Sequence, residues 1–388
     1  MISRNKGISD LKKSIRRSPI SAILGPRQCG KTTLARQIAS QYTDKGGKVT
    51  FFDCESMPDV RKLENAEYVL SPLTGLVIID EIQIKPELFG VLRVLADRPS
   101  ADVRFLILGG ASPSLIKNAS ESLAGRIEFI ELTGFSLTET GPDTMKQLWT
   151  RGGFPRSFLA ESEEDSVVWR ENFIRTFLER DIPQLGITIP QSALRRFWTM
   201  LAHFHGQIWN ASDISRSMGL SDKTVRSYLD ILTGTFMIRQ LQPWHENISK
   251  RQVKAPKIYF RDTGLLHQLL EIPDENRLLG NPRCGASWEG FALEETLRLL
   301  QPDQAWFWSV HSGPELDLLI TQNGRRIGFE FKMSEAPKIT ASIKHAVEIL
   351  SLDTLYVVYP GKDSYAVSDK IRIIPLHDLV FSLSKENI

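Results

Sequence analysis

The chain has 388 residues, of which 41% are hydrophobic and 24% are charged, and its formal net charge is +2. This length exceeds what one hydrophobic core supports, so we expect roughly two to four domains, and the composition excludes a disordered chain. No apolar run is long enough to cross a membrane, and no signal-peptide core follows the basic N-terminus. Three scattered cysteines, Cys29, Cys54 and Cys284, favour a reducing cytoplasm over disulfides or a zinc site.

The first motif occupies residues 25–32, which read Gly-Pro-Arg-Gln-Cys-Gly-Lys-Thr, the spacing G-x-x-x-x-G-K-T. An apolar run precedes it as a buried strand, and helical spacing of apolar residues follows it. A strand, a glycine loop and a helix N-terminus together cradle phosphates, which makes a chance match the weaker interpretation. We expect Lys31 to reach the β- and γ-phosphates of ATP and Thr32 to ligate Mg²⁺. The predicted nucleotide-binding residues are Gly25, Pro26, Arg27, Gln28, Cys29, Gly30, Lys31, Thr32 and Thr33.

The second motif is an apolar run, Leu76–Ile79, that ends in Asp80 and Glu81. It predicts a buried parallel strand whose carboxyl end opens onto the ligand. Asp80 is expected to hold Mg²⁺, and Glu81 to polarise the attacking water as general base. Gln83 either orients that water or lines the site. The alternative is a pair of carboxylates that begins a surface turn.

These two motifs, with Ser122-Leu-Ala-Gly-Arg126 and Leu178-Glu-Arg-Asp181, resemble prokaryotic AAA-type ATPases that join a P-loop domain to a C-terminal domain of unknown function. The resemblance covers nearly the whole chain. It implies that Ser112, shortly after a strand over Val103–Leu108, senses the γ-phosphate, although such ATPases often place a serine directly after the first glycine of this segment. Arg126 is expected to act as an arginine finger, within the chain or toward a neighbouring subunit, or else to form a surface salt bridge.

The middle of the chain is basic. Residues 192–261 contain 11 Lys/Arg and four Asp/Glu, a net charge of +7, and the remainder carries −5. Such a charge distribution suggests where a polyanion binds, although a basic surface can equally be solvated.

Within this basic stretch, residues 210–232 have the spacing of a helix-turn-helix. Gly219 ends one helix and Ser221 caps the next, whose Val225, Leu229 and Leu232 share the core-facing side. Two strands follow, Phe236–Leu241 and Lys257–Phe260, separated by a loop, which is the order of a winged helix. The residues predicted to contact DNA are Lys223, Arg226, Lys250 and Arg251. The alternative is a module for packing, dimerisation or binding of a protein partner.

The C-terminal part contains a helix over Trp288–Leu300, which bears Glu289 and Glu294, and a strand that contains Asp317. The turn Asn323-Gly324 predicts a hairpin into a further strand. On that second strand Glu330 and Lys332 share one face, because alternate strand residues point the same way.

An aspartate on one strand and Glu-x-Lys on the next resemble the core of PD-(D/E)xK nucleases. The resemblance implies that Asp317 and Glu330 hold a second Mg²⁺ or Mn²⁺ and that Lys332 activates water for phosphodiester cleavage. Glu294 is expected to complete or support that metal site. Many domains of this fold bind DNA without cutting it, so an idle site is the alternative.

Taken together, the sequence predicts an α/β protein: a P-loop parallel sheet with helices on both faces, a helical and winged-helix segment, and a C-terminal α/β PD-(D/E)xK-like domain. The expected boundaries are 1–140, 141–275 and 276–388. The leading hypothesis is a cytoplasmic, Mg²⁺-dependent ATPase that binds ATP and DNA, without a membrane segment. The alternatives are a nucleotide-switched scaffold with an inactive nuclease-like domain, and an ATP-regulated DNA nuclease. A homo-oligomer or a protein partner fits each of them.

Overall fold

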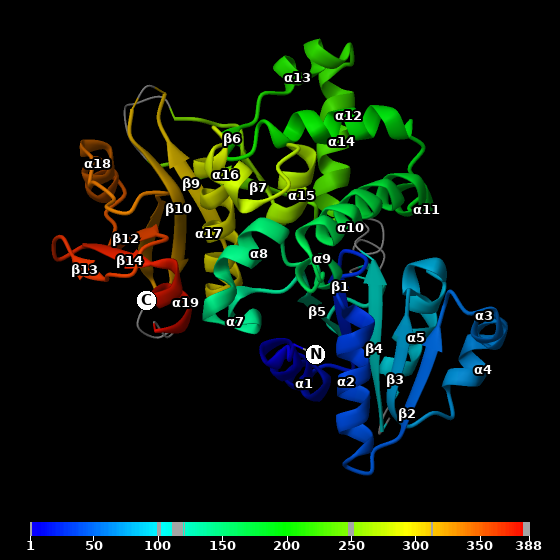
Figure 1. Cartoon of the computed structure of the whole chain (residues 1–388). Coiled ribbons are helices and arrows are strands. Elements are labelled where there is room, and N and C mark those ends of the chain that lie inside the picture. The colour runs from blue at the N-terminus through cyan, green and yellow to red at the C-terminus, as the bar shows by residue number, and fades with distance from the viewer. Residues whose placement is uncertain are drawn as a thin grey trace. The chain divides into compact units, whose positions relative to one another are not determined.

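The computed structural model describes residues 2–98, 102–110, 119, 121–246, 252–311 and 313–382. The chain forms two compact units, whose helices and strands are labelled in Figure 1. The first unit is Met1–Gly134 with Gly234–Phe236, and the second is Phe135–Thr233 with Met237–Ile388.

The first unit is built on five parallel strands in the order β2-β3-β4-β1-β5 (Figure 1). They are β1 (Ile20–Gly25), β2 (Val49–Asp53), β3 (Gly75–Asp80), β4 (Val103–Gly110) and β5 (Ile127–Glu131). The runs in β1, β3 and β4 are almost continuously apolar because a parallel sheet is buried on both faces. The carboxyl ends of these three strands meet at one edge, which carries Gly25, Asp80 and Gly110.

Helices cover both faces of this sheet. They are α1 (Asn5–Arg17), α2 (Lys31–Thr43), α3 (Met57–Lys62), α4 (Ala66–Leu70) and α5 (Leu88–Ala96). On one face Leu88 and Leu92 of α5 share a buried core with Val77 and Phe105 of the strands. Helices α1 and α2 contact each other and the strands β1 and β4. The predicted P-loop α/β fold is therefore confirmed.

The second unit begins with helices and ends with a mixed sheet. Its helices are α7 (Leu137–Thr140), α8 (Met145–Arg151), α9 (Pro155–Phe158), α10 (Glu163–Thr176), α11 (Ile182–Gln184), α12 (Gln191–Ala202), α13 (Ala211–Met218), α14 (Asp222–Gly234), α15 (Thr263–Leu269), α16 (Glu275–Leu279), α17 (Cys284–Leu300), α18 (Ala341–Ile349) and α19 (Leu376–Phe381). Its strands are β6 (Gln207–Ile208), β7 (Ile238–Pro243), β8 (Lys257–Phe260), β9 (Ala305–Ser309), β10 (Glu315–Gln322), β11 (Arg325–Phe331), β12 (Thr354–Tyr359), β13 (Tyr365–Ala366) and β14 (Ile371–Pro375).

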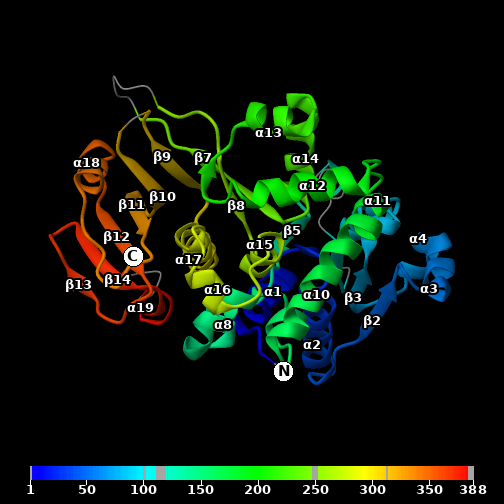
Figure 2. The same cartoon turned by 45° about the horizontal axis from the view of Figure 1, so that its top comes forward.

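These strands form one nine-stranded sheet in the order β13-β14-β12-β11-β10-β9-β7-β8-β6. The hairpin β10–β11 turns at Asn323 and Gly324, both at positive φ, as a two-residue hairpin turn requires. Strand β7 pairs antiparallel with β8 and parallel with β9. Strands from both sides of the expected boundary between residues 275 and 276 therefore belong to one sheet. Helix α17 packs against β11, α15 and α19 (Figure 2). The predicted mixed α/β C-terminal sheet is confirmed.

The helix-turn-helix spacing also folds as expected. Helices α13 and α14 meet at Gly219, which adopts a left-handed conformation, and the Ser221 hydroxyl accepts a hydrogen bond from the Thr224 amide. On α14, Val225, Leu229 and Leu232 are at most 2% exposed. The elements follow in the order α12, β6, α13, α14, β7, β8, and Phe197 of α12 contacts Tyr228 of α14 edge to face.

Candidate nucleotide-binding and acidic sites

The G-x-x-x-x-G-K-T segment links β1 to α2 in the first unit. Gly25 approaches β5 so closely that a Cβ there would lie 1.9 Å from the Leu132 carbonyl oxygen, and Gly30 has a φ of 101°. The Lys31 ammonium donates hydrogen bonds to the carbonyls of Gly25 and Pro26, at 3.1 and 2.9 Å. The ammonium therefore lies against the loop at which we expect the phosphates to bind.

The buried side chains of Arg4 and Cys29 anchor this loop within the first unit. The Arg4 guanidinium donates to the Cys29 carbonyl at 2.9 Å and to the carbonyls of Thr133 and Gly134. The Cys29 side chain is fully buried, and burial raises the pKa of its thiol. Cys29 therefore packs against the sheet rather than reacting with solutes. Nothing in the sequence marks Arg4 for this role, because it lies 25 residues from its partner.

The acids that follow β3 lie beside the loop. The Thr32 hydroxyl donates to Asp80 Oδ2 at 2.7 Å, so the two expected Mg²⁺ ligands are adjacent. Burial raises the pKa of Asp80, whose side chain is also hydrogen-bonded to the Glu81 amide. Glu81 itself has a φ of 51°, an uncommon conformation for a non-glycine residue. Strain of this kind often occurs where a side chain is aimed at a site.

Gln83 and Arg27 contact the Glu81 side chain from two directions. The Gln83 amide donates to Glu81 Oε2 and accepts from the Gly110 amide at 3.2 Å. Arg27 lies 3.8 Å from Glu81 and 3.2 Å from Glu55. Gln83 thus connects the carboxyl ends of β3 and β4. The sequence alone left its role open and did not predict the ion pairs of Arg27.

The two remaining predicted residues of this site are Ser112 and Arg126. Ser112 lies outside the described residues. Arg126 precedes β5 at the opposite edge of the sheet, because Ile127 pairs with Ile20, and β1 spans about 17 Å from there to the loop. Arg126 instead donates hydrogen bonds from Nε and Nη2 to the Asp97 carboxylate, at 2.6 and 2.8 Å, and from Nη1 to the Ala124 carbonyl. Within one chain Arg126 therefore lies away from the loop in a salt bridge, and its role toward a neighbouring subunit stays a prediction.

The three predicted residues of the C-terminal acidic site lie on β10 and β11 and just beyond them. The Glu330 and Lys332 side chains share a face, with Lys332 Nζ 2.8 Å from Glu330 Oε2. Asp317 is 4% exposed and accepts from the Phe331 amide at 3.1 Å. Burial and the nearby Asp317 charge raise the pKa of Glu330 to about 8.

The cluster also contains Lys257 of β8, which sequence reasoning did not include. Its ammonium lies 3.2 Å from Asp317 Oδ1 and 3.5 Å from Glu289 Oε1. We call the five residues Glu289, Asp317, Glu330, Lys332 and Lys257 the C-terminal acidic cluster. Within the described ranges no three Asp, Glu, His or Cys side chains are grouped so as to hold a metal ion.

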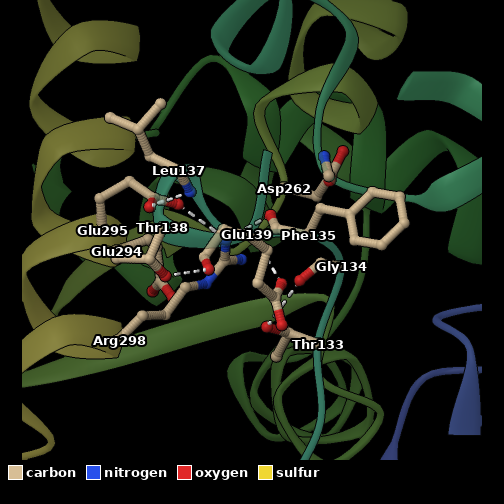
Figure 3. A network of polar contacts seen from close by, with 12 residues as sticks. Thr133, Gly134, Phe135, Leu137, Thr138, Glu139, Asp262, Glu294, Glu295 and Arg298 are labelled. Carbon is tan, nitrogen blue, oxygen red and sulfur yellow. Dashed lines mark hydrogen bonds and ion pairs between the residues drawn. The ribbon is translucent and has the colours of Figure 1, made fainter. Parts of the chain in front are cut away.

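Glu294 does not support this cluster, contrary to expectation. It is bound by the Arg239 guanidinium, with Arg261 Nε 3.7 Å away. Burial alone would raise the pKa of Glu294, but these guanidiniums outweigh it and lower the pKa to about 2. Its neighbour Glu295 accepts from the Leu137 amide at 2.7 Å and pairs with Arg298, as Figure 3 shows. These contacts connect α17 to α7, the first helix of the second unit.

Only half of the predicted DNA-binding residues are described. Lys223 and Arg226 are exposed on α14, whose Val225 and Leu229 are buried. Lys250 and Arg251 lie outside the described residues.

A parallel sheet that carries this loop and these paired acids defines a P-loop ATPase domain. Family models agree: residues 17–141 match an AAA domain, residues 142–276 a domain of unknown function (DUF8612), and residues 284–379 another (DUF4143). The chain thus carries an AAA-type ATPase domain followed by regions whose family descriptions assign no activity.

Two curated proteins are similar over the whole chain: the uncharacterised proteins Rv2008c of Mycobacterium tuberculosis and Mb2031c of Mycobacterium bovis. Each is 46% identical over 388 residues, which is 100% of this chain and 87% of the relative. The chain belongs to the same family as these two proteins. Among solved structures, the Walker-type ATPase PABY2304 of Pyrococcus abyssi is 13% identical with a TM-score of 0.49, covering 70% of this chain and 96% of its own.

Throughout the part of the chain that the structure describes, every helix is too short or too polar to span a bilayer.

Proposed function

We propose that this protein binds ATP with Mg²⁺ and hydrolyses it at the loop between β1 and α2. The observation that carries the proposal is the 2.7 Å hydrogen bond between Thr32 and Asp80, beside the Lys31 ammonium. A hydroxyl and a carboxylate, both hard oxygen donors, fit Mg²⁺, which takes few protein ligands when phosphates supply others. When bound, the ion neutralises charge on the triphosphate.

The chain's own residues supply the remaining chemistry. Lys31 exchanges its two carbonyl partners for β- and γ-phosphate oxygens, and the loop amides bind the same phosphates. Glu81 accepts the proton of the attacking water, and Gln83 fixes the Glu81 carboxylate in place. Arg27 places a guanidinium nitrogen 3.8 Å from Glu81 Oε2, so a cation lies beside this carboxylate.

The test is ATP hydrolysis by purified full-length protein and by Lys31→Ala. Loss of one preorganised charge at the transferred phosphate should lower kcat/KM by about 10²-fold or more. Lys45→Ala, which removes an exposed lysine near the end of α2, is the matched control and should leave hydrolysis unchanged. Equal rates for the parent and Lys31→Ala would refute the proposal.

DNA binding by a winged-helix module is a second proposed function. It is supported by the order of α12–α14 and β6–β8 and by the exposure of Lys223 and Arg226 on α14. In a winged helix the outer face of the third helix enters the major groove while the hairpin loop contacts phosphates. The loop between β7 and β8 holds the remaining two predicted contacts, Lys250 and Arg251.

We assign residues 1–140, 141–275 and 276–388 to an ATPase part, a helical and winged-helix part, and a nuclease-like part of a cytoplasmic protein. Arg126 is proposed to act only toward a neighbouring subunit of a homo-oligomer, and Ser112 remains the proposed γ-phosphate sensor. The nuclease-like part raises a separate question, because its carboxylates already have a cation.

A further inference from the structure

The starting observation is the position of Lys257 in the C-terminal acidic cluster. Lys257 is 5% exposed, although lysine is rarely buried without a compensating partner. Its ammonium lies between Asp317 and Glu289 and 5.7 Å from the centre of the Phe307 ring. It comes from β8, which is 60 residues before Asp317, so tertiary structure alone brings it there.

The carboxylate oxygens that a nuclease would offer to a metal are largely engaged. Asp317 accepts from Lys257 at one oxygen and from the Phe331 amide at the other. Glu289 Oε1 accepts from the Tyr259 hydroxyl at 2.5 Å. Glu330 Oε2 pairs with Lys332, and Glu330 Oε1 is buried with no hydrogen-bond partner. Both oxygens of Asp317 are therefore engaged, and one of them is engaged by an ammonium rather than by a neutral donor.

The charges of the cluster point the same way. The Lys257 ammonium lies within 3.5 Å of the carboxylates of Asp317 and Glu289, and the Lys332 ammonium lies 2.8 Å from Glu330. Three carboxylates therefore face two ammonium groups, which leaves at most one uncompensated negative charge. A divalent cation would have to bind beside the Lys257 ammonium or displace it, and Lys257 is buried where there is little water to take it up.

We propose that the Lys257 ammonium serves as the built-in cation of the C-terminal acidic cluster, in the place where a nuclease of the resembled fold holds a divalent metal. The residues do not fit a metal while Lys257 is present. The cluster then acts as an ion-pair clasp that fixes β8 to β10, and the nuclease-like part does not cut DNA. The inference concerns the second unit alone and does not depend on ATP hydrolysis.

The test measures Mn²⁺ binding to nucleotide-free full-length protein by electron paramagnetic resonance of free Mn²⁺. Every protein carries Asp80→Asn, so that the P-loop contributes no site. We expect the same weak binding with and without a further Asp317→Asn change. We also expect Lys257→Met to raise Mn²⁺ affinity by about tenfold or more, because it removes the competing charge, and Asp317→Asn to abolish that gain. Lys254→Met, an exposed lysine of the same segment, is the matched control and should gain nothing.

Tight Mn²⁺ binding by the Lys257-containing protein that disappears with Asp317→Asn would overturn the proposal. So would Mn²⁺-dependent DNA cleavage that is lost in Lys332→Ala, which would mean that Lys257 assists a working metal site. If Lys257→Met does not fold, the comparison with and without Asp317→Asn still decides. Equal binding in that pair supports the built-in cation, and unequal binding refutes it.

Discussion

The two acidic sites of this protein use the same residue types and reach different electrostatic states. In the first unit, Asp80 accepts from the neutral Thr32 hydroxyl, while Lys31 contacts loop carbonyls. In the second unit, Asp317 accepts from the Lys257 ammonium. A carboxylate whose partner is neutral keeps its charge available for a metal ion, whereas a carboxylate paired with a buried ammonium does not. The comparison teaches that a carboxylate motif predicts a metal site only when the position of nearby cations is known.

The largest effect is expected from Glu81→Gln, which tests the proposed ATPase site of the first unit. Glutamine keeps the shape of the side chain but cannot accept the proton of water. We expect kcat for ATP hydrolysis to fall by about 10²- to 10⁴-fold, with nucleotide affinity little changed. Steady-state kinetics and equilibrium nucleotide binding measure the two quantities separately. Glu87→Gln, at an exposed glutamate nearby, is the control, and an unchanged kcat in Glu81→Gln would show that Glu81 is not the base.

Glu294→Gln tests a buried carboxylate of the second unit whose charge is neutralised by neighbouring guanidinium groups. The change leaves the Arg239 and Arg261 guanidiniums without their buried counter-charge, so the free energy of unfolding should fall by about 3 kcal/mol. Urea denaturation at neutral pH measures this loss. The exposed Glu335→Gln is a suitable control and should change stability little.

The same residue predicts a pH dependence. Because the folded pKa of Glu294 is about 2 and its ordinary value is 4.5, its contribution is complete above the ordinary value. The contribution is lost as the pH falls through that window toward the folded pKa. The difference in unfolding free energy between the parent and Glu294→Gln should therefore narrow on acidification. A difference that stays constant down to the acid limit of folding would contradict this assignment.

A smaller, uniform effect is expected at the exposed cations of α14. Replacing Lys223 and Arg226 with alanine should weaken duplex DNA binding and reduce the slope of log affinity against log salt by about 2. Fluorescence anisotropy over a salt series measures the slope. The double change Lys12→Ala and Lys13→Ala, at two exposed lysines of α1, is the control. An unchanged slope in the α14 variant would remove DNA contact by this helix.

The smallest effect is expected for Arg126→Ala in dilute protein. The Arg126–Asp97 pair lies at the edge of the sheet opposite the loop, so kcat per chain should not change. If Arg126 acts in a neighbouring subunit, kcat of the parent will rise with protein concentration and that of the variant will not. A fall in kcat of Arg126→Ala at high dilution would show that Arg126 acts within its own chain.

The parts of both sites that the sequence predicted are local in the chain. The P-loop, the acids after β3 and the hairpin at Asn323-Gly324 depend on spacings of a few residues, and the structure has these elements where the patterns indicated. Arg4 and Lys257 were missed because each reaches its partner only through tertiary packing. No short spacing contains that information.

Helix geometry explains why Glu289 joins the C-terminal acidic cluster and Glu294, which the sequence analysis favoured, does not. The two residues are five apart on α17, and at about 100° per residue their side chains diverge by about 140° around the axis. They therefore face different surroundings, Glu289 toward Lys257 and Glu294 toward Arg239. Helical projection rules out a site that uses both. It does not tell which of the two faces the sheet.

The pairing of β7 with β9 affects how the second unit can be divided in the laboratory. A fragment that begins at residue 276 would lack β7, and also Lys257 of β8. The backbone groups of β9 along Trp306 and Phe307 would then form an unprotected sheet edge. Such an edge readily recruits other chains, so the isolated fragment should aggregate, whereas a fragment that begins at residue 135 keeps the edge covered.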